Sequence, residues 1–151
     1  MQQETTAWLL NLGQSLYAAI GENDLVHVID YSEISDLPAL LANTENSVHW
    51  QGKELNVINL AKYLSDRTLT MLSSEPIIGV VAYQSDNYDR PQYGGVLMAG
   101  IPAKKIVNNS QACELPEPVQ KWRDVAISCY SDEGRPVPVL DLPTVFSTGL
   151  S

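Results

Sequence analysis

The sequence predicts a mainly β protein whose short strands form a barrel or a sandwich. Short apolar stretches are separated by Gly, Pro and Asn turns about every 8–12 residues, a spacing typical of all-β folds. Few windows have the apolar periodicity of a long helix. A third observation, an internal repeat, indicates that the β unit occurs twice.

Seven apolar stretches have the length and composition of strands. In chain order they are Ala7–Leu12, Leu16–Ile20, Glu54–Leu60, Pro76–Tyr83, Gly95–Ala99, Ala126–Tyr130 and Arg135–Leu140. The first two flank the turn at residues 13–15 and the last two flank residues 131–134, so each pair predicts a hairpin. The uninterrupted apolar run of Pro76–Tyr83 is typical of a strand that is buried on both faces.

Three segments between these strands are less regular. Asn23 or Asp24 is a candidate N-cap for a short helix through Val26–Ile29, although the Val-x-Val-Ile pattern is also typical of a strand. A polar loop is expected at about residues 35–47, and a polar hairpin loop at Gln84–Tyr93.

The internal repeat relates residues 52–65 to residues 134–147 without gaps. Identical residues occupy the pairs Gly52/Gly134, Val57/Val139, Leu60/Leu142 and Ser65/Ser147. In each copy a Gly turn leads into a strand, an Asn or Asp ends the strand and caps the next segment, and one helical turn supplies apolar side chains. Two copies predict two small, similar β-subdomains, with chance similarity over so short a match as the alternative.

Composition and charge disfavour several classes of function. The chain is 44% hydrophobic, as in folded proteins, and carries 9 Lys and Arg against 18 Asp and Glu. No Lys or Arg precedes Lys53, which disfavours binding to nucleic acid or to anionic membranes. The sequence has no export or transit pattern, and its apolar runs are too short to cross a membrane. We therefore expect a soluble cytoplasmic protein without nucleic-acid or membrane partners.

Few residues could carry catalysis or bind a metal. The histidines are His27 and His49, and with Cys113 and Cys129 they lack the close spacing of a structural zinc site. No Gly-x-Ser-x-Gly nucleophile elbow occurs. The cysteines are expected as two free structural thiols, with a single disulfide as the alternative. The sequence thus predicts no catalytic, cofactor-binding or metal-binding residues.

The order of these elements resembles the CheW-type coupling proteins of bacterial chemotaxis. The shared features are an N-terminal strand pair, a short amphipathic segment, a Leu-Pro loop, a Gly turn into an apolar strand, a second Gly-initiated strand and a closing apolar-Asp-Leu strand. They occur here at Leu16–Ile20, Leu25–Ile29, Leu37-Pro38, Gly52 with Val57–Leu60, Gly95–Met98 and Val139–Leu142. The resemblance extends from about Ala7 to Phe146.

The resemblance implies a single CheW-like domain, residues 1–151, made of two intertwined SH3-like five-stranded β-barrels with few short helices. It implies an adaptor without catalytic activity or cofactor. Such an adaptor couples the cytoplasmic tips of methyl-accepting chemoreceptors to the regulatory domain of a CheA-type histidine kinase. Two alternatives stay open: a stand-alone ligand-binding β-barrel or small enzyme unrelated to chemotaxis, and a scaffold for a non-chemotactic kinase pathway.

The resemblance also implies a receptor groove formed by Val26, Gln51, Ile101 and Lys104. Gln51 occupies the place of a functionally important Arg, and Lys104 stands where an apolar residue is common. The other departures from the family pattern are His49-Trp50 for Asn-Leu, Asn56 and Asn59 for Pro and Asp, and Ala99 for Asp. We therefore expect a divergent member of the family, with an acidic surface beside the groove.

Overall fold

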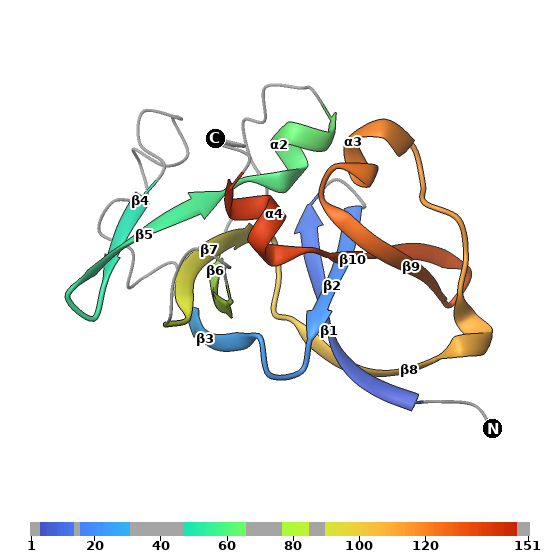
Figure 1. Cartoon of the computed structure of the whole chain (residues 1–151), viewed down its shortest axis with the longest axis horizontal. Helices are drawn as coiled ribbons and strands as arrows, with labels where there is room; N and C mark the ends of the chain where they lie inside the picture. Colours follow the sequence, from blue (N-terminus) through green and yellow to red (C-terminus); the bar gives the residue numbers. More distant parts are fainter. Residues whose placement is uncertain (1–3, 14–15, 31–46, 66–76, 85–89, 148–151) are drawn as a thin grey trace.

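The computed structural model describes residues 4–13, 16–30, 47–65, 77–84 and 90–147. Two curled five-stranded sheets lie next to one another, and three short helices lie near their junction (Figure 1). Sheet A has the strand order β8-β1-β2-β10-β9, and sheet B has the order β3-β6-β7-β5-β4. The predicted fold class, two SH3-like five-stranded units with few short helices, is confirmed.

The strands of sheet A are β1 (Glu4–Gly13), β2 (Leu16–Gly21), β8 (Ala103–Asn108), β9 (Ala126–Asp132) and β10 (Arg135–Leu140). The strands of sheet B are β3 (Leu25–Ile29), β4 (Ser47–Trp50), β5 (Lys53–Ile58), β6 (Ile77–Tyr83) and β7 (Gln92–Met98). The helices are α2 (Leu60–Ser65), α3 (Val119–Arg123), α4 (Leu142–Ser147) and the 3-10 turn η2 (Asn109–Gln111). None of the helices in the described part of the chain is long and apolar enough to span a membrane.

The two sheets follow the same scheme of strand pairing. An antiparallel pair, β1–β2 or β6–β7, forms the centre, and β8 or β3 adds to its first strand in antiparallel orientation. On the other side, β10 pairs in parallel with β2, and β5 pairs in parallel with β7. The parallel contacts join Val139 to Ala19 and Val57 to Gly95, so equivalent valines of the repeat occupy equivalent places.

Both repeat copies begin in a tight hairpin turn. Gln51 and Gly52 have φ values of 48° and 74°, and Glu133 and Gly134 have values of 52° and 79°. Two successive residues with positive φ are the mark of a type I′ turn, whose twist matches that of the adjoining strands. The Gly at the second position adopts this conformation without the steric penalty that a Cβ atom brings.

The helices that come after the repeated strands contact the opposite sheet. Helix α2 follows β5 of sheet B and contacts β1 of sheet A. Helix α4 follows β10 of sheet A, and its Phe146 ring stacks on Tyr83 of β6 with the ring centroids 5.0 Å apart. An added Cβ atom at Gly94 of β7 would overlap the Phe146 ring, so a glycine is required there. Each sheet is therefore fixed to the other by a helix.

The main core lies between the two sheets and is shared by them. It includes Leu10 and Ile20 from sheet A, Val96 from sheet B, and Trp122 from α3, all almost fully buried. Each sheet also has a small cluster of its own, around Leu55 in sheet B and around Val137 in sheet A. Because most apolar burial is in the shared core, the sheets stabilise each other.

Several local predictions need correction. The segment after Asn23 is a strand and not a helix, because the Asp24 carbonyl accepts a hydrogen bond from Ala82 N of β6 at 2.9 Å. The strand expected to run to Leu60 ends at Ile58, and Leu60 begins α2. Strand β7 begins at Gln92, inside the expected loop. Strands β4 and β8 and helix α3 were not predicted, and most of the loop expected at residues 35–47 lies outside the described residues.

Candidate functional site

The four residues predicted to form a receptor groove lie on the edges and turns of the two sheets. Val26 lies in β3, the edge strand of sheet B, and Lys104 lies in β8, the edge strand of sheet A. Ile101 lies between β7 and β8, and Gln51 lies in the turn between β4 and β5. In Figure 1 the turn between β2 and β3 lies at the lower side of the molecule, where the chain passes from sheet A to sheet B.

Val26 is exposed because β3 contains a β-bulge. Leu25 pairs with Val81 and His27 pairs with Val80, so Val26 is an extra residue without an opposite partner. A bulge of this kind bends the strand and turns side chains away from strict alternation. As a result Val26 and His27 are both exposed, with Val26 at 46%. A residue that the alternation would bury is presented to solvent instead.

Lys104 is bound to the turn between β2 and β3. Its Nζ lies 3.3 Å from Oε1 of Glu22 and 5.3 Å from the centre of the Trp8 ring. The indole Nε1 of Trp8 donates to the backbone oxygen of Glu22 at 3.0 Å. Since the Lys104 and Glu22 side chains are about half exposed, the ion pair has little effect on stability, but it orients the lysine.

Ile101 is the most exposed large apolar side chain among the described residues, at 84%. It stands three residues before Lys104, next to the point where Ala99 N donates to the Asn11 carbonyl of β1 at 2.8 Å. That hydrogen bond holds the start of the segment between β7 and β8 against strand β1 of sheet A. The structure therefore presents an apolar side chain on a connection that is fixed at its base.

Gln51 lies apart from the β2–β3 turn, but its neighbour Trp50 contacts strand β3. Its preceding residue, Trp50, stacks on His27 with the ring centroids 5.9 Å apart, and His27 follows Val26 in β3. Trp50 also lies 6.4 Å from the Tyr93 ring of β7, measured between centroids. These aromatic contacts join edge strands β3 and β4 and close the curl of sheet B.

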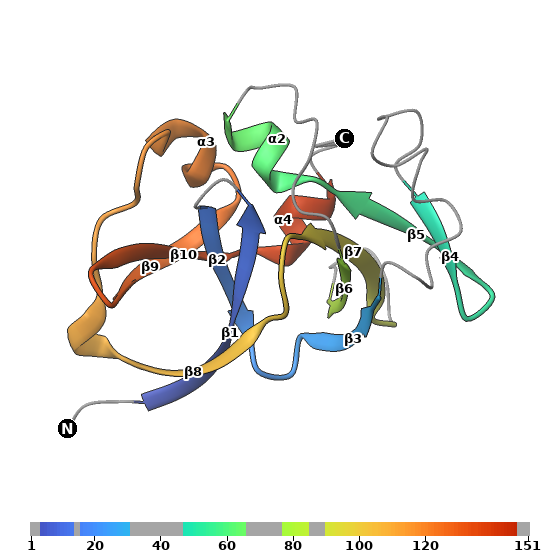
Figure 2. The ribbon, with the colours of Figure 1, turned by 180° about the vertical axis from the view of Figure 1, so that it is seen from behind.

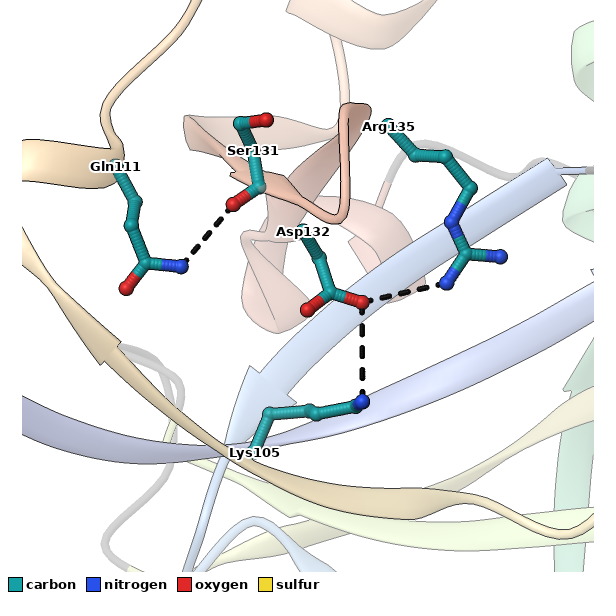
Figure 3. A network of polar contacts seen from close by, with 5 residues as sticks. All are labelled: Lys105, Gln111, Ser131, Asp132 and Arg135. Carbon is teal, nitrogen blue, oxygen red and sulfur yellow. Dashed lines mark hydrogen bonds and ion pairs between the residues drawn. The ribbon is translucent and has the colours of Figure 1, made fainter.

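Sheet A is closed by polar contacts between its own edge strands. Asp132 at the end of β9 lies 3.9 Å from Lys105 Nζ of β8 and 3.3 Å from Arg135 Nη2 of β10 (Figure 3). Gln111 Nε2, just after β8, donates to the carbonyl oxygen of Ser131 at 3.0 Å. We call this group, Lys105, Gln111, Ser131, Asp132 and Arg135, the polar seam.

A cavity of about 590 Å³ lies against sheet A and is lined by residues of β1, β2, β8, β9 and β10. Its walls include Ala7, Ile20, Val107 and Val139. Tyr130 also lines it, and the Tyr130 hydroxyl is buried with no hydrogen-bond partner among the described residues. Burial, and secondarily the charge of Asp132, raises the pKa of Tyr130 to about 12. The neutral phenol is therefore the form present at ordinary pH.

The residues considered for catalysis or metal binding are not brought together. His27 and His49 lie on sheet B, whereas Cys129 lies in β9 of sheet A and Cys113 lies opposite it. Among the residues that the structure describes, no three His, Cys, Asp or Glu side chains form a group that could hold a metal ion. Asp141 directly precedes α4, and its Oδ2 accepts a hydrogen bond from Thr144 Oγ1 at 2.8 Å.

The architecture has a counterpart among solved structures. The crystal structure of the scaffolding protein TtCheW from Thermoanaerobacter tengcongensis matches with a TM-score of 0.70, covering 99% of this chain and 92% of that chain. The chain has the CheW fold. Sequence identity over this match is 14%, and neither a protein-family model nor a curated protein matches the sequence. The CheW fold expected from the resemblance is confirmed.

Proposed function

We propose that this protein is a non-catalytic adaptor that couples chemoreceptors to a CheA-type histidine kinase in a chemosensory array in the cytoplasm. The CheW fold supports the proposal, because the matching structure is that of a scaffolding protein. The observation that carries it is the exposure of Val26 and Ile101, which lie within four residues of Glu22 and Lys104, the two members of an ion pair. Exposed apolar side chains at fixed positions suit the docking of an amphipathic helix.

The proposed organisation is one CheW-like domain built from two intertwined subdomains. The repeat supports this organisation, because residues 52–65 and 134–147 each form a type I′ turn, a strand and a short helix. The helices α2 and α4 both contact the opposite sheet. An adaptor of this form binds its partners with sheet edges that are fixed relative to one another.

The proposed roles of the four groove residues differ. Val26 and Ile101 supply apolar contact with a receptor helix, and most of the binding free energy comes from such a small cluster. Lys104, oriented by Glu22 and Trp8, pairs with acidic groups on that helix. Gln51, at the tip of the β4–β5 turn, donates neutral hydrogen bonds where the family commonly has Arg.

The receptor part of the proposal is tested by calorimetric titration with a fragment of a chemoreceptor cytoplasmic tip. Replacing Val26 with Asp buries a charge on docking, so Kd is expected to rise about tenfold or more. Ile127→Asp is the matched control, because Ile127 is also an exposed apolar residue, at 67%, but lies in β9 of sheet A. Equal affinities for wild type and Val26→Asp would remove Val26 from the site.

The kinase part is tested by size-exclusion chromatography with the regulatory domain of a CheA-type kinase. A complex is expected when both proteins are present at about 10–50 μM, the range of weak signalling contacts. An adaptor must bind both partners, so the absence of a complex with the kinase domain, or of a complex with the receptor tip, would contradict the adaptor role. Binding to the kinase domain of an unrelated pathway alone would instead support the non-chemotactic scaffold.

A ligand-binding barrel is the second candidate, and the cavity of sheet A favours it. Its volume of about 590 Å³ lies within the range of small-molecule sites, and its walls are mainly apolar and include the buried phenol of Tyr130. A dye that fluoresces in apolar sites, such as ANS, tests it. Saturable binding that Val139→Trp abolishes would support a ligand site, whereas no binding by the folded protein would reject it.

A further inference from the structure

The two cysteines, 16 residues apart in the chain, face each other across a short antiparallel contact. Ala112 and Tyr130 form an isolated antiparallel bridge, and the adjacent Cys113 N donates to the Cys129 carbonyl oxygen at 3.0 Å. On the other side of the bridge, Gln111 Nε2 donates a hydrogen bond to the Ser131 carbonyl oxygen. Residues 111–113 therefore continue the edge of sheet A beside β9, with Cys113 directly opposite Cys129.

This arrangement fits the geometry of a disulfide. Residues that form a hydrogen-bonded antiparallel pair have Cα atoms about 5.5 Å apart, which lies inside the range of about 4.4–6.8 Å found for disulfides. The two Sγ atoms of Cys113 and Cys129 are 3.4 Å apart and share a hydrogen bond. To form a disulfide, the two sulfur atoms must approach each other by about 1.4 Å, to the S–S distance of about 2.0 Å.

The two thiols differ in access to solvent. Cys113 is exposed and Cys129 is buried at the wall of the sheet A cavity. Burial, and then the hydrogen bond with Cys113, raises the pKa of Cys129 to about 12. An external reagent therefore meets Cys113 first, and Cys129 is positioned to act as the resolving thiol.

We propose that Cys113 and Cys129 form a redox site that a small-molecule disulfide oxidises to an intramolecular disulfide. The Cys113 thiolate attacks one sulfur of the small disulfide, and the other half leaves as a thiolate that takes a proton. Cys129 then gives its proton to solvent and attacks the Cys113 sulfur, which releases the second half as a thiol. The small disulfide is reduced to two thiols while the protein loses two electrons and two protons.

The consequence of oxidation is a covalent closure of sheet A. The bridge joins the segment after β8 to β9, next to the polar seam and at the wall of the cavity. In the reduced protein hydrogen bonds and ion pairs hold this edge. Oxidation therefore fixes the edge against opening and leaves sheet B unchanged.

The test is a redox titration of the full chain with oxidised and reduced glutathione at about pH 8, where exchange is rapid. Free thiols are trapped with N-ethylmaleimide and the peptides are mapped by mass spectrometry. The expected product is a monomer with Cys113 linked to Cys129. A stable glutathione adduct on Cys113 with Cys129 free, or a disulfide-linked dimer as the main product, would overturn the proposal.

A parallel titration in urea measures how much the fold favours formation of the Cys113–Cys129 disulfide. A disulfide that encloses a loop of this length stabilises a protein by about 3 kcal/mol. The ratio of oxidised to reduced glutathione that oxidises half of the protein is therefore expected to be about 100-fold lower in buffer than in urea. The oxidised protein is expected to unfold at a temperature about 5–10 °C higher than the reduced protein. Equal half-oxidation ratios in buffer and urea would contradict the positioning of the pair by the fold.

Two variants complete the test. Cys129→Ser is expected to keep a glutathione adduct on Cys113, because no resolving thiol remains. Since Cys129 is buried and this variant could unfold, Cys113→Ser provides the second measurement at the exposed position. In folded Cys113→Ser the remaining thiol is expected to resist glutathione. Rapid modification of Cys129 in that variant would contradict the assigned order of attack.

Discussion

The two sheets have the same scheme of strand pairing but close their edges by different chemistry. In sheet B the edge strands β3 and β4 meet through the stack of His27 on Trp50, which Tyr93 extends. In sheet A the edges meet through the polar seam and through the contact of Cys113 with Cys129 (Figures 1 and 3). The strand-pairing scheme is thus shared by the two sheets, whereas the closure belongs to each sheet separately.

This difference separates the proposed functions in space. The edge of sheet B exposes Val26 through a bulge and lies next to the Lys104–Glu22 ion pair. The edge of sheet A holds the thiol pair and the cavity. Seen from the opposite side, β3 and β9 lie in different halves of the molecule (Figure 2). Docking and oxidation can therefore occur without competing for the same residues.

The largest effect is expected from breaking the aromatic closure of sheet B. Trp50→Ala removes the contacts with His27 and Tyr93 and exposes the cluster around Leu55, at a cost of about 3 kcal/mol. Urea unfolding measures the loss. The control is Asn56→Ala, which changes an exposed residue of the neighbouring strand β5 and is expected to have little effect. A loss equal to that of the control would mean that the stack does not hold the edges together.

An intermediate effect is expected at the contact between α4 and sheet B. Gly94→Ala places a Cβ atom against the Phe146 ring and is expected to destabilise the protein by about 2 kcal/mol. The second substitution Phe146→Leu makes room for the added methyl group. The double variant is therefore expected to be more stable than Gly94→Ala alone. Additive losses in a double-mutant cycle would contradict a direct contact.

The last effect is absent near neutral pH, is expected only at alkaline pH, and concerns sheet A. The pKa of Cys129 is raised from 9.0 to about 12 and that of Tyr130 from 10.0 to about 12. The unfolded chain therefore releases these protons first, so the free energy of unfolding falls as the pH rises from about 9 towards 12. Urea unfolding at intervals from about pH 8 to pH 11 checks this slope.

The control for the pH dependence is Cys129→Ala. This variant keeps Tyr130 and is expected to move the start of the decline up to about pH 10, the ordinary pKa of a tyrosine. A stability that stays constant from about pH 9 to pH 11 in the wild type would show that neither group is protected by the fold.

Much of the strand pattern could be predicted from the sequence, but the weakly apolar elements could not. The pairing of β1 with β2 and of β9 with β10 follows from apolar runs on both sides of a Gly turn. Strand β8 was missed because Lys104 and Lys105 interrupt its apolar pattern, yet it pairs with β1 along its whole length. Tertiary pairing stabilises this strand where local propensity does not.

The candidate site was accessible to sequence reasoning only in part. The resemblance indicated Val26, Ile101 and Lys104, but strict alternation would make Val26 share a face with Val28, which is half-buried. The exposure of Val26 depends on a bulge that no local residue signals. The pairing of the cysteines depends on the register of residues 111–113 against β9, so the sequence left free thiols and a disulfide both open.

The amino-acid sequence by itself determined the elements that repeat: the Gly turns, the apolar strands of residues 52–65 and 134–147, and the mainly β class. These are local properties, since turn conformation and side-chain alternation depend on residues that are close in the chain. Only the tertiary structure decided which edges meet and which side chains face each other across them. Such contacts join residues far apart in the chain, as Trp50 with His27 and Cys113 with Cys129 do, and they depend on strand register.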